Sequence, residues 1–143
     1  MYIKSPLNYT GGKYQLLPML TQIFPKQINT FVDLFAGGFN VGVNIKANKI
    51  ICNDHINYLI DMYQYFKDTS EPDLLNSISK RIQKFELNQK NAEGYNTLRN
   101  VYNENQNSLD LFILTCYAFN HQIRFNNNQK FNSPFGRDRS SYN

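Results

Sequence analysis

The 143-residue chain has no tryptophan, only two cysteines and only two histidines. Cys52 and Cys116 lie in apolar runs and form no Cys-x-x-Cys pair, so we expect buried free thiols, as in a reducing cytoplasm. His55 and His121 lack metal-ligand spacing, which predicts no metal site. No apolar run reaches membrane-spanning length, and the N-terminus lacks a signal-peptide core. A cytoplasmic protein without a membrane partner is therefore expected.

Two common glycine-rich phosphate motifs are also missing. GxxxxGK[ST] does not occur, and the spacing of Gly37, Gly38 and Gly42 does not give GxGxxG, which disfavours a dinucleotide-dependent oxidoreductase. Charged residues make up only 18% of the chain, and the net charge is +4. This mildly basic balance permits a nucleic-acid partner without requiring one.

The apolar periodicity predicts strands alternating with helices up to Lys67, and helices alone beyond it. Short turns between these elements favour a parallel α/β layer. A polar stretch at 68–72 resembles a hinge. The expected strands are 30–35 and 49–53, and the expected helices are 13–24, 40–44, 55–66, 74–85, 92–102 and 108–120.

The strongest functional signal is a glycine turn, Gly37-Gly38, between the first strand and a helix, followed by Asp54 at the end of the second strand. Such a turn lets the backbone approach a ligand, and an acid about 20 residues later can accept ribose hydroxyls. With Asp33 ahead of the turn, the pattern favours S-adenosylmethionine. Taken singly, the glycines could form a plain tight turn, Asp54 could cap a helix, and Lys13 could be a solvated lysine.

Several segments together resemble the N-terminal half of the Dam-type, alpha-order DNA adenine-N6 methyltransferases. They are Tyr9-Thr10-Gly11-Gly12-Lys13, Asp33-Leu34-Phe35-Ala36-Gly37-Gly38, the acid Asp54, Tyr117-Ala118-Phe119-Asn120, Arg124-Phe125-Asn126 and Phe131-Asn132-Ser133-Pro134-Phe135-Gly136. The resemblance covers most of the chain. It implies an enzyme of the restriction-modification or Dam-like kind, which transfers a methyl group from S-adenosylmethionine to adenine N6 in double-stranded DNA.

The resemblance also implies a fold and a set of site residues. The fold would be a partial, Rossmann-like methyltransferase layer over residues 1–67, with a helical target-recognition region over 68–143. The implied cofactor-binding residues are Tyr9, Lys13, Asp33, Gly37, Gly38 and Asp54, and the implied DNA-binding residues are Arg124, Asn126, Asn132, Arg137 and Arg139. Arginine and aromatic side chains suit phosphates and bases; a loosely ordered basic tail is the alternative for this last segment.

The catalytic D/N-P-P-Y/F motif of that family does not occur in these residues. Asn132-Ser133-Pro134-Phe135 differs from it by one residue, but the polar stretch before it is no buried strand, so no catalytic residue is assigned. We expect the chain alone to be inactive: a truncated gene product, one half of a split enzyme, or an engineered piece. The exposed edge of its half-sheet predicts a complementing C-terminal half. The alternative function is a non-catalytic module that binds DNA or cofactor.

Overall fold

The computed structural model describes residues 1–9 and 11–139. Thr10 of the N-terminal motif, and residues 140–143 at the end of the predicted recognition region, lie outside the described residues. The chain divides into two compact units, the first being Met1–Ile60 and the second beginning at Asp61. The division of roles between residues 1–67 and 68–143 stays a prediction.

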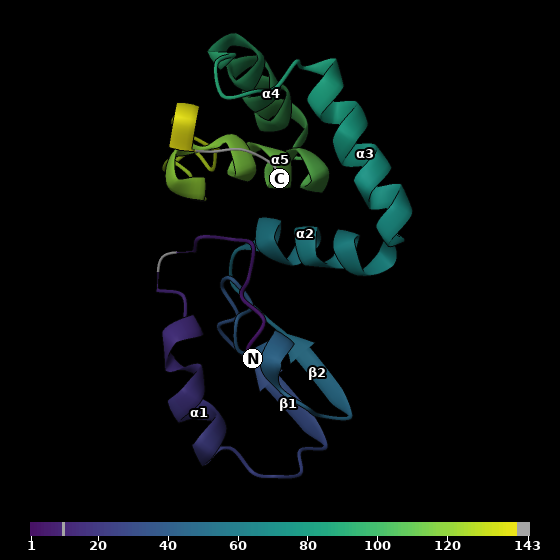
Figure 1. Ribbon diagram of the computed structural model, residues 1–143, viewed down its shortest axis with the longest axis vertical. Coiled ribbons are helices and arrows are strands. Elements are labelled where there is room, and N and C mark those ends of the chain that lie inside the picture. Colours follow the sequence, from purple (N-terminus) through teal and green to yellow (C-terminus); the bar gives the residue numbers. More distant parts are fainter. Residues whose placement is uncertain (10, 140–143) are drawn as a thin grey trace. The chain divides into compact units, whose positions relative to one another are not determined.

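The first unit contains a short parallel sheet (Figure 1). Strand β1 (Thr30–Asp33) pairs with β2 (Lys49–Cys52) in the register Thr30 to Lys49 through Asp33 to Cys52. Both strands are rich in β-branched and aromatic residues, which favour extended backbone. The predicted neighbouring parallel strands are confirmed, and the chain is a mixed α/β protein.

The helix expected at 13–24 is two elements instead of one. A 3-10 turn, η1 (Tyr14–Leu16), leads into α1 (Leu17–Ile23), which carries Pro18 in its first turn. Proline has no N–H to donate, so it is tolerated where an α-helix starts and not within one. A second 3-10 turn, η2 (Gly42–Asn44), replaces the helix expected at 40–44.

Helices dominate the second unit, as predicted, but their ends differ from the expected ones. They are α2 (Asn57–Asp68), which begins in the first unit, α3 (Glu71–Lys84), α4 (Ala92–Asn105) and α5 (Ser108–Tyr117). The polar stretch at 68–72, which resembles a hinge in the sequence, holds the last residue of α2, a two-residue link and the first two residues of α3. Ser70 caps α3 by accepting the Asp73 N–H, and Pro72 lies in the first turn, so the polar residues start a helix.

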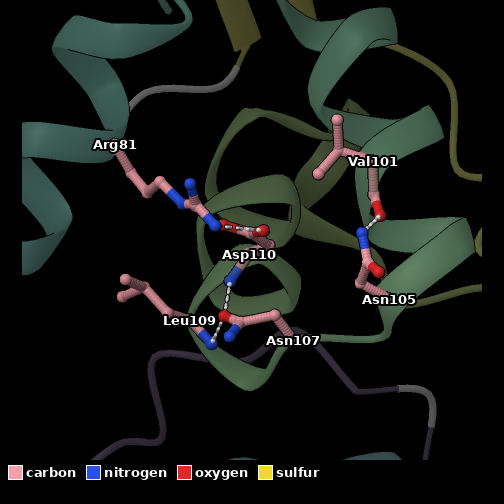
Figure 2. A network of polar contacts seen from close by, with 6 residues as sticks. All are labelled: Arg81, Val101, Asn105, Asn107, Leu109 and Asp110. Carbon is pink, nitrogen blue, oxygen red and sulfur yellow. Dashed lines mark hydrogen bonds and ion pairs between the residues drawn. The ribbon is translucent and has the colours of Figure 1, made fainter.

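Helix α5 is the buried centre of the second unit and contacts both α3 and α4. Asn107 caps it, and Arg81 of α3 pairs with Asp110 in its first turn through Nε to Oδ1 (2.7 Å) and Nη2 to Oδ2 (3.0 Å) (Figure 2). Burial raises the pKa of Asp110, and the Arg81 hydrogen bond and charge oppose that rise. The pair therefore joins α3 to α5 at a carboxyl group whose charged form is disfavoured by burial and favoured by Arg81.

Helix α5 was expected to continue to residue 120 but ends at Tyr117. The helix ends because its C-cap residue, Ala118, is extended (φ −76°, ψ 153°), and a 3-10 turn, η3 (Phe119–His121), follows, in which Asn120 has a positive φ of 53°. Within residues 1–9 and 11–139, no helix combines the length and apolarity of a membrane crossing. The same residues hold no cluster of three or more His, Cys, Asp or Glu suited to a metal ion.

Candidate cofactor pocket and DNA-facing segment

The carboxyl ends of β1 and β2 place the glycine turn. Beyond the last strand residues, Asn53 donates its N–H to the Asp33 carbonyl (2.9 Å), and Ala36 donates to the Asn53 carbonyl (2.9 Å). The Asn53 side chain also donates to the Leu34 carbonyl (2.9 Å). The hydrogen bonds between the two strands thus continue into the loop and fix the position of the glycine turn. Gly37 adopts a positive φ of +48° in this turn.

Asp54 joins this loop to the start of α2. Its Oδ2 accepts the Gly37 N–H (2.8 Å) and its Oδ1 accepts the Ile56 N–H (3.1 Å), while the side chain is only 6% exposed. The bond to Ile56 lies just before α2, which begins at Asn57, so Asp54 is not the N-cap of a helix starting at His55. Each carboxylate oxygen can accept more than one hydrogen bond, so a ligand hydroxyl can still be bound.

Tyr9 and Lys13 reach the same loop from the N-terminal motif. The Tyr9 ring packs on Gly37 so closely that a Cβ there would lie 2.9 Å from ring atom Cδ1. The Lys13 ammonium donates to the Phe35 carbonyl (3.1 Å), leaving two N–H groups for a ligand. Burial, and next the charge of Asp54, raise the pKa of the Tyr9 hydroxyl, which stays neutral at physiological pH.

These groups line one cavity of about 210 Å³. Five of the six predicted cofactor residues lie on it: Tyr9, Lys13, Gly37, Gly38 and Asp54. It is smaller than the roughly 300–1,000 Å³ of typical small-molecule sites. The pocket offers a cation, a carboxylate and a backbone cradle, a combination that suits a ligand carrying both an amino-acid end and hydroxyl groups.

Asp33 is the predicted residue that the structure does not place on the cavity lining. It is buried beneath the turn, where its Oδ2 accepts the Gly42 N–H (3.0 Å). The hydrogen bond from Gly42, the first residue of η2, to Asp33 stabilises the conformation of the loop between β1 and η2. Its contribution is therefore to loop geometry, since its carboxylate faces protein backbone.

Sequence reasoning missed Asn40, which is buried and lines the cavity. Its Oδ1 accepts the Ser5 N–H (2.9 Å), and Asn44 one turn later exchanges two hydrogen bonds of 2.7 Å with the Ile3 backbone. These two asparagines hold the N-terminal segment beside the glycine turn. The available signal was an amide two positions after the glycine pair, between the apolar residues Phe39 and Val41.

The segment after η3 is an ordered hairpin. Phe125 and Phe131 form an antiparallel bridge, and the Asn126 side chain accepts the N–H groups of Asn128 (2.9 Å) and Lys130 (3.0 Å). Asn126, one of the implied DNA-binding residues, thus uses its side-chain oxygen to close the turn. The alternative of a loosely ordered tail does not describe this hairpin.

Three of the predicted DNA-binding residues are exposed arginines. Arg124 donates Nε–H to Oδ1 of Asn132 (3.0 Å) and Nη2–H to its carbonyl (3.2 Å). Arg139 of η4 (Arg137–Arg139) lies over the Phe119 ring at 5.5 Å, and Arg137 starts the same turn. Arg124 and Asn132 therefore come together, while Arg137 and Arg139 form a separate exposed pair.

The catalytic-like sequence at 132–135 is built into this segment by internal hydrogen bonds. Tyr95 donates its hydroxyl to the Ser133 carbonyl (2.9 Å), and Phe119 donates its N–H to the Pro134 carbonyl (2.8 Å). A catalytic motif must direct such acceptors at the amine of a target base. Their internal use supports leaving this sequence out of the catalytic assignment.

A family model now decides the relationship. The model of the D12 class N6 adenine-specific DNA methyltransferases matches residues 9–143. The chain belongs to this family. The match starts at Tyr9 and so includes the N-terminal motif, the glycine turn, Asp54 and the hairpin. It confirms the resemblance noted in the sequence.

Curated members of the family align with nearly the whole chain. It is 51% identical over 141 residues to the type II methyltransferase M.FokI of Planomicrobium okeanokoites and 48% identical over 141 residues to the modification methylase StsI of Streptococcus sanguinis. It is 33% identical over 140 residues to a DNA adenine methylase of Salmonella typhi. Each alignment covers 95–99% of this chain, but only 22% of the first two proteins and 49% of the third.

Proposed function

We propose that these residues form the cofactor-binding and target-recognition part of a DNA methyltransferase that transfers a methyl group from S-adenosylmethionine to adenine N6. The single observation that carries this proposal is the cavity that Tyr9 and Lys13 of the N-terminal motif, Gly37 of the glycine turn and Asp54 line together. Lys13 would meet the ligand carboxylate, and Asp54 its ribose hydroxyls.

We assign the DNA-facing role to the second unit. Arg124 and Asn132 on the hairpin would approach base edges, and Arg137 and Arg139 would contact phosphates, because exposed guanidinium groups pair well with both. The hairpin supports this assignment by holding Arg124 on an ordered backbone. Asn126 contributes to DNA binding indirectly, by closing the turn of the hairpin that carries Arg124.

Methyl transfer requires a group that holds the adenine amine, and the D/N-P-P-Y/F motif for this is not among the 143 residues. We propose that a complementing segment supplies it and extends the sheet toward a Rossmann-like one. The sheet supports this: Val32 is 49% exposed, and Ile50 and Ile51 are 39% and 38% exposed. Parallel strands are normally covered on both faces, so these three exposed apolar side chains suit a covering helix, and the unpaired edges of the two-stranded sheet suit a further strand.

The alternative is a binding module without catalysis, and its support is the same missing motif. The two functions differ in one assay. We expect the purified 143-residue chain to transfer no methyl group to DNA from tritiated S-adenosylmethionine, and methylation to appear when a segment carrying D/N-P-P-Y/F is supplied. Methylation by the chain alone that Asn132→Ala abolishes would contradict both the assignment of no catalytic residue and the need for a second segment.

Cofactor binding is tested separately by ultraviolet crosslinking of tritiated S-adenosylmethionine, which detects weak complexes. The cavity is small, so we expect weak labelling that unlabelled S-adenosylhomocysteine suppresses and NAD does not. Lys13→Ala should reduce it, while the control Lys46→Ala removes an equally charged, exposed lysine that does not line this cavity. Equal labelling of both variants would refute the pocket assignment.

A further inference from the structure

One face of α4 holds the backbone of the hairpin. Tyr95, Arg99 and Asn103 follow each other at intervals of four residues and therefore lie on the same side of the helix. The Tyr95 hydroxyl donates to the Ser133 carbonyl (2.9 Å), and Arg99 Nη1 lies 3.5 Å from the same oxygen. Helix α4 thus fixes the hairpin through side chains that contact its main chain.

Asn103 takes the place of a neighbouring strand. Its Oδ1 accepts the Phe131 N–H (2.7 Å) and its Nδ2 donates to the Phe131 carbonyl (3.0 Å), which is the pair of bonds that a strand partner would make. Phe131 also bridges to Phe125 on its other side and is 1% exposed. The hairpin bonds are made by its chain neighbours, since the Lys130 carbonyl accepts the Asn126 N–H (2.9 Å) and Asn132 donates its N–H to the Arg124 carbonyl (3.0 Å). This stretch of backbone is therefore held from two directions.

This anchoring extends to the exposed guanidinium of Arg124. Asn132 lies between Phe131, which Asn103 holds, and Ser133, which Tyr95 holds, so both of its flanking residues are fixed. Asn132 then accepts two hydrogen bonds from Arg124, through its side-chain and backbone oxygens. A guanidinium has five N–H donors, so three remain for a base or phosphate.

We propose that Asn103 is a positioning residue that sets the orientation of Arg124 before DNA arrives. The inference rests on the proposed function of the hairpin as the DNA reader. A long side chain that is already ordered loses less conformational entropy when it binds DNA. A guanidinium group held in one orientation also discriminates between base edges better than a mobile one. Asn103 itself contacts protein backbone and acts only through Phe131, Asn132 and Arg124.

The first experiment needs no DNA activity. In ¹⁵N spectra of the chain we expect Asn103→Ala to raise amide hydrogen exchange at Phe131 on the order of tenfold, the effect of one lost hydrogen bond or slightly more. It should also shift or broaden the Arg124 Nε–H signal. Asn105→Ala is the matched control, because Asn105 lies on α4 and its side chain bonds back to the Val101 carbonyl of the same helix (3.3 Å) (Figure 2). Tyr95→Phe, which removes a single hydroxyl, should act like a weaker Asn103→Ala.

The second experiment measures sequence choice by selecting from a pool of randomised DNA duplexes with the completed enzyme. We expect Asn103→Ala to lower sequence enrichment at least roughly tenfold while total DNA binding stays within a few fold, since Arg137 and Arg139 remain. An unchanged Arg124 Nε–H signal in Asn103→Ala overturns the positioning role, as does unchanged enrichment. If the unmodified enzyme shows no sequence enrichment but the spectra respond as expected, the proposed DNA function fails and Asn103 is only a structural anchor.

Discussion

Replacing Gly37 by alanine tests how the cofactor loop is held. Gly37 has a φ of +48°, where a residue with a Cβ costs roughly 1–2 kcal/mol. The added Cβ would also lie 2.9 Å from Cδ1 and 3.1 Å from Cε1 of the Tyr9 ring. Overpacking of this kind costs about 1–3 kcal/mol, so we expect a total loss of roughly 2–5 kcal/mol.

Gly11→Ala is the matched control for this substitution. Gly11 also has a positive φ, +77°, but among the described residues beyond its chain neighbours an added Cβ there would meet no atom within 4 Å, so only the backbone cost of roughly 1–2 kcal/mol should be seen. The difference between the two variants isolates the contact with Tyr9. In a Tyr9→Ala background that difference should vanish, which makes a double-mutant cycle.

Urea unfolding followed by far-ultraviolet circular dichroism measures these free energies, since the chain has no tryptophan to report by fluorescence. Crosslinking of S-adenosylmethionine gives the second readout, and Gly37→Ala should lose most of it because Tyr9 must move. Equal destabilisation by Gly37→Ala and Gly11→Ala, in both backgrounds, would refute the packing of Tyr9 on the glycine turn.

Three further outcomes follow from other contacts. Asp54→Ala should abolish most of any S-adenosylmethionine crosslinking, since a charged acceptor is worth roughly 1.5–3 kcal/mol; undiminished labelling would contradict the assignment. Arg81→Met should destabilise the second unit by about 3–5 kcal/mol at pH 7 by leaving a buried carboxylate unpaired. Burial raises the pKa of Asp110, and the variant removes the Arg81 hydrogen bond and charge that oppose that rise, while the charge of Lys84 remains. Stability should therefore fall as pH rises above the acid's unfolded pKa and recover toward pH 4, a profile that thermal melts would test. Alanine at both Arg137 and Arg139 should reduce the salt slope of DNA binding by about two units in a filter-binding titration with the completed enzyme; an unchanged slope would make them ordinary surface residues.

The sequence alone predicted the elements whose signals are local. Strands 30–35 and 49–53 are apolar runs between turn residues, and the glycine pair follows the first of them, so their order predicted a parallel pair with a loop at its carboxyl end. Residue identity and spacing were also enough to recognise the family, because the three N-terminal motifs occur in a fixed order. Helix ends were predicted less well: Ser70 caps a helix in a stretch whose polarity alone suggested a hinge.

Only the tertiary structure decided what each polar side chain does, because a hydrogen bond depends on the partner brought to it. Asp33 and Asp54 are the same residue type at similar strand ends, yet one faces the backbone of η2 beneath the loop and the other lines the cavity. Asn103 looks like an ordinary helix-surface residue until Phe131, 28 positions later, lies against it. Composition and periodicity specify which face is apolar, whereas long-range backbone placement determines whether a carboxylate or amide braces the fold or meets a ligand.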